Sequence, residues 1–539
     1  MNFRIGVDFD NTIACYDEVF PEVATRLGFA AGGNLRTKTG VKEEILSRDG
    51  GDTAWQKLQG QVYGKYMPLA SGFPGFAEFL ILCKLRGHAV FVVSHKSEYG
   101  HFDAKKVPLR SAATTWMRAT GLLADDTLSL SESDIFFEAE REAKIDRIAA
   151  LSCTHFIDDL HEVLVAPTFP ETTKRILFAP GTEIATTAGI ESARSWREIS
   201  SRLLGAWTEA EVCEAAKLRF QDLGVTGASL RKGRGNSRIF ELTSLRGRNY
   251  ALKVYPDRQI DRRPRLQTEF SACSALGAAG FDVATPIASD AALDWGVYEW
   301  LPGTPIEMPD RCFVEKAAEF VEGLVQKRTF LAKAAAFPAA SEACLRGGEI
   351  VSQIQSRLER LRRVKSPVLA GFLEGEFLAA FEAASTSARE QRALAFDASI
   401  GPELQILSPS DFGAHNAIKS ESGRISFIDF EYFGWDDPVK LVADFYWHPG
   451  MNLTSDLRTQ WIARCGEVFR DDASYAARLD AYLPLYGLRW CLILLNEFLP
   501  AGFAKRMHAD SGLGRDMDSV LVLQLGKSKS LLTQIVKKQ

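Results

Sequence analysis

The chain has 539 residues, more than a single hydrophobic core usually serves, so we expect two or three domains. Hydrophobic residues make up 46% of it and charged residues 25%, the balance of a soluble globular protein. The formal net charge of −5 argues against a nucleic-acid binder, which usually has a strong basic excess. The 9 cysteines form no C-x-x-C pair, which favours packed, reduced thiols in a cytoplasmic protein over a disulfide framework or a zinc site.

Apolar runs of strand length recur through residues 1–205. They are FRIGVDF (3–9), HAVFVVSH (88–95), THFIDD (154–159) and KRILFAP (174–180). Amphipathic helical patterns lie between these runs, among them DIFFEAEREAKIDRIAAL (134–151). Continuous apolar strands that alternate with helices predict a parallel sheet covered on both faces, an α/β Rossmann-like fold. The connection between Asp10 and the second run is too long for a simple loop, so it predicts a small helical cap, at about residues 14–80.

Polar side chains follow these predicted strands. Asp8 and Asp10 come after the first, Ser94 ends the second, Asp158 and Asp159 end the third, and Lys144 lies on the helix leading into the third. In a parallel sheet, ligands bind beyond the carboxyl ends of the strands, so these residues are expected to form one site. Two carboxylates at a buried strand end need a metal ion or a proton to offset their repulsion.

The order D-x-D-x-T (Asp8, Asp10, Thr12), Ser94, Lys144 and an acidic pair resembles the motifs of the haloacid dehalogenase superfamily, over residues 1–205. The resemblance implies a phosphatase. Asp8 would attack phosphorus to give an aspartyl-phosphate, and Asp10 would protonate the leaving oxygen and then activate water. Thr12, Ser94 and Lys144 would bind the phosphoryl oxygens. Mg²⁺ would be held by the four aspartates: Asp8, Asp10, Asp158 and Asp159.

A new helical pattern begins at Thr208, where we place the domain boundary. No linker rich in Pro, Gly or Ser precedes it, which favours two docked halves over two tethered ones. The following stretch reads as strand, glycine turn, strand, turn and strand. Gly233 and Gly235 in the first turn let backbone N–H groups approach a phosphate. Lys253 lies in the third strand, and Glu269 lies on the next helix, placed to pair with it.

The stretch from residue 406 to 438 is the most informative part of the second half. NAIK, SESG and RISFID predict a hairpin whose open end brings Asn416 beside Asp429, with Asp411 just upstream. One carboxylate beside an amide and a second carboxylate that can share Mg²⁺ is the arrangement that phosphoryl transfer from ATP requires.

Residues 208–539 resemble the aminoglycoside phosphotransferase and choline kinase group, which has an α+β, bilobal, protein-kinase-like fold. The resemblance implies an N-lobe at about 208–303 and a C-lobe at about 304–539. It also implies that Gly233, Gly235, Lys253 and Glu269 bind ATP, that Asp411 deprotonates the acceptor hydroxyl, and that Asn416 and Asp429 bind Mg²⁺. The sequence departs from the group before Asp411, where Pro409-Ser410 stands in place of His-Gly.

Few residues separate Asp429 from Asp436, so no long segment is predicted that could cradle a peptide, and a small hydroxyl acceptor is favoured. Four nearby aromatics offer either a cage for a quaternary ammonium group or, by preference, core packing. They are Tyr432, Phe433, Trp435 and Trp447. The most apolar late stretch (483–500) contains Arg489 and Glu497, so it predicts a core helix rather than a membrane span.

A phosphatase and a kinase on one chain would waste ATP if they acted on the same ester. The leading hypothesis is therefore a bifunctional enzyme whose sites act on different positions of a sugar or polyol, or on successive intermediates, on a route to an activated nucleotide sugar. One alternative is a choline or aminoglycoside type of kinase with an unrelated phosphatase. Another is a regulatory binding protein with one inactive site. The sequence leaves open both substrates and the oligomeric state.

Overall fold

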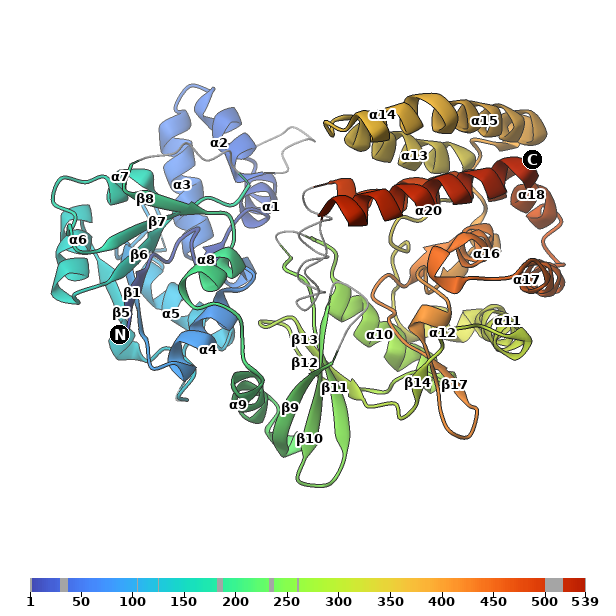
Figure 1. The fold of residues 1–539 in the computed structure, drawn as a ribbon. Coiled ribbons are helices and arrows are strands. Elements are labelled where there is room, and N and C mark those ends of the chain that lie inside the picture. Colours follow the sequence, from blue (N-terminus) through green and yellow to red (C-terminus); the bar gives the residue numbers. More distant parts are fainter. Residues whose placement is uncertain are drawn as a thin grey trace.

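The computed structural model describes residues 2–29, 37–103, 105–124, 126–181, 188–231, 237–258, 261–499 and 517–538. Figure 1 shows an N-terminal half built on one sheet, a second sheet at the middle of the chain, and a helical C-terminal part. Gly233 and Gly235 of the predicted ATP-binding turn lie outside the described residues.

The first half contains a six-stranded sheet in which every neighbouring pair of strands is parallel. Across the sheet the strands are β5 (Ile135–Glu138), β4 (Ala89–His95), β1 (Arg4–Val7), β6 (His155–Asp158), β7 (Lys174–Phe178) and β8 (Ile190–Ala193). Its centre is buried because β1, β4 and β6 consist of apolar runs that neighbouring layers cover. The prediction of a parallel sheet is confirmed.

Two strands of this sheet were not foreseen from the sequence. Residues 134–151 read as helical throughout, but Ile135–Glu138 form the edge strand β5, and helix α6 (Arg141–Ala150) begins only afterwards. The aromatic and β-branched start of this stretch suits a strand, and pairing with β4 decides the outcome. Strand β8 (Ile190–Ala193) carried no distinct signal.

Helices cover the sheet and build the insertion after β1. The helices that cover the sheet are α4 (Phe76–Leu85), α5 (Leu109–Ala119), α6, α7 (His161–Leu164) and α8 (Trp196–Leu203). The insertion contains α1 (Val19–Arg26), α2 (Lys38–Leu46) and α3 (Gly51–Tyr63), closed at its base by the strand pair β2 (Ala14–Cys15) and β3 (Ser71–Gly72). Figure 1 shows the three helices standing together beside the sheet, which is the place expected of a cap.

The second half opens with α9 (Glu209–Arg219), whose N-terminus is capped by Thr208 and Glu211. A five-stranded antiparallel sheet follows. Its strands are β9 (Val225–Arg231), β10 (Arg238–Ser244), β11 (Asn249–Val254), β12 (Pro286–Asp290) and β13 (Trp295–Glu299), in the order β12-β13-β11-β10-β9. Helix α10 (Arg265–Ala278) lies between β11 and β12 in the chain.

The remaining part is mostly helical, and its helices share one large apolar core. They are α11 (Arg311–Gln326), α12 (Arg328–Ala334), α13 (Gly347–Arg362), α14 (Pro367–Phe372), α15 (Leu378–Arg392), α16 (Pro438–Trp447), α17 (Ser455–Val468), α18 (Tyr475–Ile493) and α20 (Met517–Lys538). The short strands of this part are β14 (Thr304–Pro305), β15 (Ile406–Ser408), β16 (Ala417–Lys419), β17 (Ile425–Phe427) and β18 (Gly434–Asp436). Strands β16 and β17 form the predicted hairpin.

The first part of the predicted core helix of residues 483–500 belongs to helix α18, which ends at Ile493 and buries most of its side chains; a short 3-10 turn (Asn496–Phe498) follows. None of the described helices combines the length and the apolar character that a membrane crossing requires.

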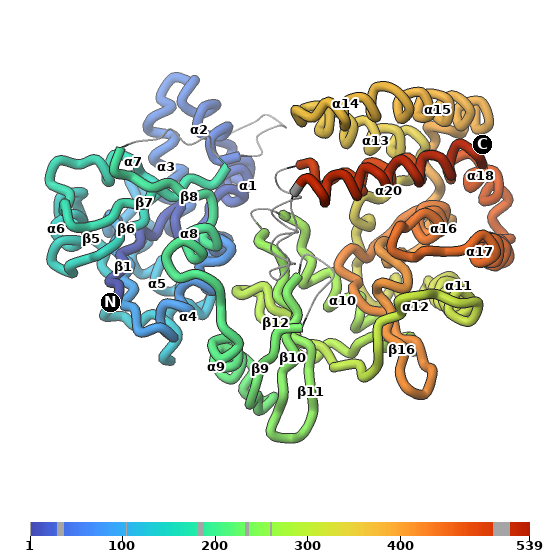
Figure 2. The backbone as a smooth tube through the Cα atoms, viewed as in Figure 1, coloured from blue at the N-terminus to red at the C-terminus, as the bar shows by residue number. Residues whose placement is uncertain are grey.

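The two halves are docked, as the absence of a linker predicts. Ile81 on α4 packs in one apolar cluster with residues of α9 and the five-stranded sheet. Glu78 on α4 pairs with Arg197 at 2.9 Å, and the indole Nε1 of Trp295 on β13 donates to the same carboxylate at 3.3 Å. Figure 2 follows the chain from α8 into α9 at this junction. The N-terminal half therefore supports the sheet that carries Lys253.

Candidate active sites

The first candidate site lies at the carboxyl ends of β1, β4 and β6. Register pairs Val7 with Val92 and with Ile157, and the backbone N–H of Asp8 donates to the carbonyl of Ile157 at 2.9 Å. Because these three strands are parallel neighbours, their ends meet at one edge of the sheet. Asp8, Ser94 and Asp158 thus reach the same region, as the sequence predicts, and all three are buried.

Lys144 on α6 bridges the two buried carboxylates at the strand ends. Its Nζ lies 2.6 Å from Asp8 Oδ1 and 2.7 Å from Asp158 Oδ2, and its side chain is 1% exposed. Burial alone would lower the pKa of Lys144, but the two carboxylates raise it above its ordinary value. Lys144 is therefore a fixed positive charge at the site, where phosphoryl oxygens would also be attracted.

Asp8, Asp158 and Asp159 form an all-carboxylate cluster whose ligand oxygens lie within 4.8 Å of one another. Burial raises the pKa of Asp158 to about 6, with Asp8 adding to the effect against Lys144. Burial and the charges of Asp8 and Asp158 raise the pKa of Asp159 to about 8. A divalent cation would relieve this repulsion, and oxygen ligands suit Mg²⁺. The residues present therefore fit the predicted metal.

Asp10 lies apart from that cluster. Its two carboxylate oxygens accept hydrogen bonds from Lys96 Nζ at 2.9 and 2.7 Å, and Tyr16 Oη donates to Oδ1 at 2.5 Å. The structure thus groups Asp10 with a lysine and a tyrosine, and Asp10 is not part of the cluster formed by Asp8, Asp158 and Asp159. Thr12 is buried, and its hydroxyl donates to Asp159 Oδ1 at 3.4 Å.

Three residues of this site escaped the sequence analysis. Lys96 follows Ser94 by two positions, so its place at the end of the second strand was a usable signal. Tyr16 and Lys38 belong to the insertion, where no motif is readable. Lys38 on α2 donates to Asn11 Oδ1 at 2.8 Å, so the insertion reaches the loop that bears Asp8 and Asp10.

Replacing Lys144 by methionine should leave Asp8 and Asp158 facing each other without a cation. Breaking a buried ion pair on one side costs about 3–5 kcal/mol, so we expect a clear fall in the midpoint of thermal unfolding. Added Mg²⁺ should recover part of the loss, because it replaces the missing charge. The matched control is Lys84→Met, whose partner Asp134 is partly exposed and whose loss should cost at most about 1 kcal/mol. Equal shifts for the two variants would contradict this account.

The second candidate site is centred on Lys253 of β11. Its Nζ lies 2.6 Å from Glu269 Oε2, 2.6 Å from Asp429 Oδ1 and 3.1 Å from Glu431 Oε2. Burial opposes the charge of Lys253, but the three carboxylates raise its pKa well above the ordinary value. The sequence predicts that Lys253, Glu269 and Asp429 share one site, and in the structure Lys253 contacts both carboxylates. Glu431, which also pairs with Arg265, was missed.

Asp429 carries the features of a metal ligand. Its backbone φ is positive, at 70°, and its carboxylate lies 2.6 Å from Lys253 Nζ. Burial raises its pKa to about 7, and Glu431 and Glu269 add to the rise while Lys253 opposes it. The carboxylate oxygens of Asp429, Glu431 and Glu269 lie within 4.8 Å of one another, so these three residues could hold a divalent cation.

The predicted hairpin is present and sets the rest of the site. In β16 and β17, Ala417 pairs with Phe427, and the backbone N–H of Ile428 donates to the carbonyl of Asn416 at 3.0 Å. Asn416 and Asp429 therefore leave the hairpin at the same end. Asn416 Nδ2 also donates to the backbone carbonyl of Asp411 at 2.9 Å, which ties the loop before the hairpin to its base.

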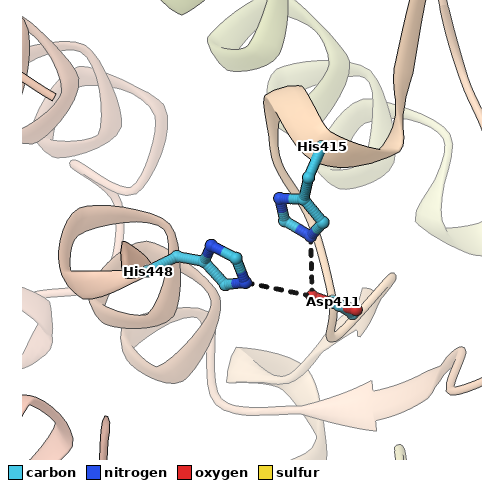
Figure 3. A group of neighbouring side chains, drawn as sticks. All are labelled: Asp411, His415 and His448. Carbon is cyan, nitrogen blue, oxygen red and sulfur yellow. Dashed lines mark hydrogen bonds and ion pairs between the residues drawn. The ribbon is translucent and has the colours of Figure 1, made fainter. Parts of the chain in front are cut away.

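Asp411 lies beside two histidines that the sequence analysis did not consider. Figure 3 shows the rings of His415 and His448 both directed at its carboxylate. His415 Nε2 lies 2.8 Å from Asp411 Oδ1, and His448 Nε2 lies 3.8 Å from the same oxygen. Burial alone would raise the pKa of Asp411, but the hydrogen bond from His415 and the ring of His448 lower it to about 2. Asp411 is therefore an ionised carboxylate with one oxygen already engaged.

The four aromatics near this site do not form a cage. Phe433 and Trp447 are buried in the core of the helical part, and Trp447 Nε1 donates to the carbonyl of Leu483 at 2.7 Å. The ring of Tyr432 is covered by the guanidinium groups of Arg263 and Arg265, 4.7 and 4.9 Å from its centre. Arg328 lies 5.0 Å from the centre of Trp435. These contacts fit the preferred interpretation, in which the four aromatics are packing residues.

Comparisons with known proteins bear on the second half. The model of the phosphotransferase enzyme family matches residues 226–482. A search of the curated proteins found no match.

Among solved structures, a choline/ethanolamine kinase family protein from Mesorhizobium loti is similar, with 17% identity and a TM-score of 0.40, over 60% of this chain and 94% of its own. A choline kinase from Streptococcus pneumoniae has 14% identity and a TM-score of 0.41, over 60% of this chain and 98% of its own. An amicoumacin kinase has 16% identity and a TM-score of 0.40, over 63% and 96%.

The family match spans the whole set of residues around Lys253 and Asp411, from β9 to the middle of α18. Residues 226–482 are therefore a domain of the phosphotransferase enzyme family.

Proposed function

We propose that residues 208–539 form an ATP-dependent kinase for a small hydroxyl compound. The observation that carries this proposal is the contact of Lys253 with both Glu269 and Asp429, close to the hairpin that bears Asn416. Lys253 holds the phosphates of ATP, and Glu269 keeps the lysine in place. Mg²⁺ held by Asn416 and Asp429 would supply the positive charge that offsets the negative charge of the phosphates.

Asp411 aligns the acceptor hydroxyl and takes its proton as the oxygen attacks the γ-phosphorus, while the bond to the ADP oxygen breaks. A small acceptor is supported by the chain after Asp429. Strand β18 (Gly434–Asp436) and helix α16, which begins at Pro438, follow almost at once. This leaves little chain between the hairpin and α16 to hold a peptide.

We further propose that residues 1–205 form a phosphomonoesterase. The support is the grouping of Asp8 with Lys144, Asp158 and Asp159 at one sheet edge, with Asp10 nearby on Lys96. An Asp8 oxygen attacks phosphorus, the ester oxygen leaves with a proton from Asp10, and water then cleaves the aspartyl-phosphate as Asp10 takes its proton. Mg²⁺ at the aspartate cluster would offset the charge of the phosphoryl group.

Together the two sites suit one metabolite that loses a phosphate at one position and gains one at another. Removing and adding the same phosphate would only consume ATP, so the positions must differ. Moving phosphate between hydroxyl groups prepares sugars and polyols for nucleotide activation, and we propose this as the role of the chain.

The test is metabolite profiling of the purified protein with ATP, Mg²⁺ and a panel of sugar and polyol phosphates, with choline and an aminoglycoside included. We expect a panel member to gain a phosphate and a phosphate ester to be hydrolysed. Lys253→Ala should remove the first activity, because the phosphates of ATP lose their cation, and should leave the second. Phosphorylation of choline or the aminoglycoside alone would replace the sugar hypothesis.

A further inference from the structure

We propose that His415, held by a ring stack with His448, is a positioning residue that fixes one oxygen of Asp411 and leaves the other free for the acceptor. This inference rests on the proposed kinase function of residues 208–539. It concerns two histidines that lie outside the predicted set of site residues and come from different elements, a short turn (Ala414–Asn416) and the end of α16.

His415 is a hydrogen-bond donor to Asp411. Its Nε2 lies 2.8 Å from Oδ1, and a carboxylate oxygen can only accept, so Nε2 carries the proton. The other ring nitrogen, Nδ1, is buried and has no hydrogen-bond partner within the described part of the chain. A single strong contact therefore sets the orientation of this ring, and that contact is with Asp411.

His448 supplies the surface against which His415 rests. The two rings are stacked with centres 4.0 Å apart and planes 5° from parallel. The edge of Trp490 meets His448 from another side, with ring centres 4.5 Å apart. Burial and the neighbouring His415 lower the pKa of His448 to about 4, so this ring is neutral at neutral pH. The ring of His415 is thus held both by stacking on His448 and by its hydrogen bond to Asp411.

The hydrogen bond at Nδ1 of His448 determines which nitrogen of the neutral ring carries the proton. The backbone N–H of Gly450 donates to Nδ1 at 3.1 Å, so in the neutral ring the proton sits on Nε2. Figure 3 shows that this nitrogen also points at Asp411. At 3.8 Å from Oδ1 it is too far for a hydrogen bond, but its N–H dipole favours the negative charge there.

The same facts argue against a metal ion at this place, although the three ligand atoms lie within 4.8 Å of one another. A metal-bound histidine almost always donates its other N–H to an acceptor. His448 Nδ1 instead accepts from Gly450, and His415 Nδ1 faces no acceptor among the described residues. His415 therefore donates a hydrogen bond to Asp411, and His448 directs an N–H at it from 3.8 Å, so neither ring offers Asp411's neighbourhood a free lone pair for a metal ion.

The consequence is a preorganised base. Asn416 holds the backbone carbonyl of Asp411 at 2.9 Å, and His415 holds Oδ1 of its side chain. Rotation of the carboxylate would break the second bond, so Oδ2 keeps one direction. A fixed acceptor oxygen lowers the entropy cost of aligning the attacking hydroxyl, and a misplacement of about 1 Å can cost roughly 10²-fold in rate.

The experiment measures steady-state release of ADP from Mg²⁺–ATP by the full-length protein, with water as the acceptor. His415→Ala should lower kcat roughly 10-fold or more and leave KM for ATP within about twofold, because no nucleotide contact is lost. His415→Gln places an amide N–H near the position of Nε2 and should restore most of the rate. A role in folding alone would not produce this split or this rescue.

Two control variants separate the possible failures. His448→Phe keeps a ring for stacking but loses the N–H that faces Asp411, so it should slow the reaction less than His415→Ala does, and an equal loss would overturn the assignment of the hydrogen bond to His415. Asp411→Asn should be slow. Wild-type activity of Asp411→Asn would overturn the kinase assignment itself. A slow Asp411→Asn with a fully active His415→Ala, or with a His415→Gln as slow as His415→Ala, would overturn the positioning role alone.

A second measurement does not depend on turnover or on a stable alanine variant. Nitrogen-15 NMR of the full-length protein distinguishes the two neutral tautomers of a histidine, and the spectrum of His415→Gln identifies the signal. We expect the proton of His415 on Nε2. A proton on Nδ1 would place a lone pair against the carboxylate of Asp411, and the proposal would be wrong.

Discussion

Asp8→Asn is expected to abolish the release of phosphate from p-nitrophenyl phosphate, with a loss of roughly 10³-fold or more, because an amide cannot form the covalent intermediate. The substitution keeps the shape of the side chain and its place beside Lys144. Release of ADP from ATP by the other half should be unchanged, since Lys253 and Asp411 are untouched. Both reactions are followed on the same preparation, by absorbance of p-nitrophenol and by a coupled ADP assay.

Asp17→Asn is a matched control for that variant. Asp17 lies in the same loop region after β1, but its side chain is exposed and outside the aspartate cluster, so the exchange should change neither rate. Chelation of Mg²⁺ should abolish hydrolysis in the wild type. An Asp8→Asn enzyme that still hydrolyses the ester at the wild-type rate would exclude Asp8 as the nucleophile.

The architecture of the first half is predictable from its sequence where a strand has an apolar centre. Strands β1, β4 and β6 are of this kind, and their ends fix where Asp8, Ser94 and Asp158 must meet. Edge strand β5 (Ile135–Glu138) was taken for helix because the next residues have a strong helical pattern, and only pairing with β4 separates the two. An edge strand is decided by a neighbour that is distant in the chain, so a local pattern cannot locate it.

Site residues were predictable where a recognisable strand, helix or hairpin carries them. Lys253 lies in a predicted strand, Glu269 on the predicted helix after it, and Asp429 at the end of the predicted hairpin. Lys96 was missed because a lysine after a strand usually faces solvent, whereas here it is buried against Asp10. His448 directly follows α16, and its contact with Asp411 depends on how that helix packs against the loop before the hairpin.

The docking of the halves adds a physical link that no motif contains. Trp295 neighbours Val254 across β13 and β11, and it donates to Glu78 of the first half. Helix α4 therefore supports the sheet that carries Lys253. The C-terminal part contacts the same sheet where Asp429 and Glu431 pair with Lys253. Helix α4 also packs against β4, the strand that carries Ser94.

Asp411→Asn and Asp429→Asn are expected to fail in different ways, and the comparison tests the second site most sharply. Asp411 precedes the hairpin and is tied to its base by Asn416, and in the proposed mechanism it faces the acceptor and not the nucleotide. Loss of its base should lower phosphoryl transfer by roughly 10²-fold or more, the usual scale for general base catalysis, with ATP affinity nearly unchanged. Asp429 contacts Lys253 at 2.6 Å and belongs to the cluster that fits a divalent cation. Its loss should weaken binding of Mg²⁺–ATP itself.

Calorimetric titration of each variant with nucleotide, in the presence and absence of Mg²⁺, gives the affinities, and transfer to the best acceptor of the panel gives the rates. Glu403→Gln serves as the matched control, since this carboxylate lies in a surface turn away from Lys253 and Asp411. Transfer at the wild-type rate by Asp411→Asn would remove the base from the mechanism. Unchanged Mg²⁺ dependence in Asp429→Asn would move the metal to other ligands, because a cation bound through Asp429 cannot keep its affinity once that charge is gone.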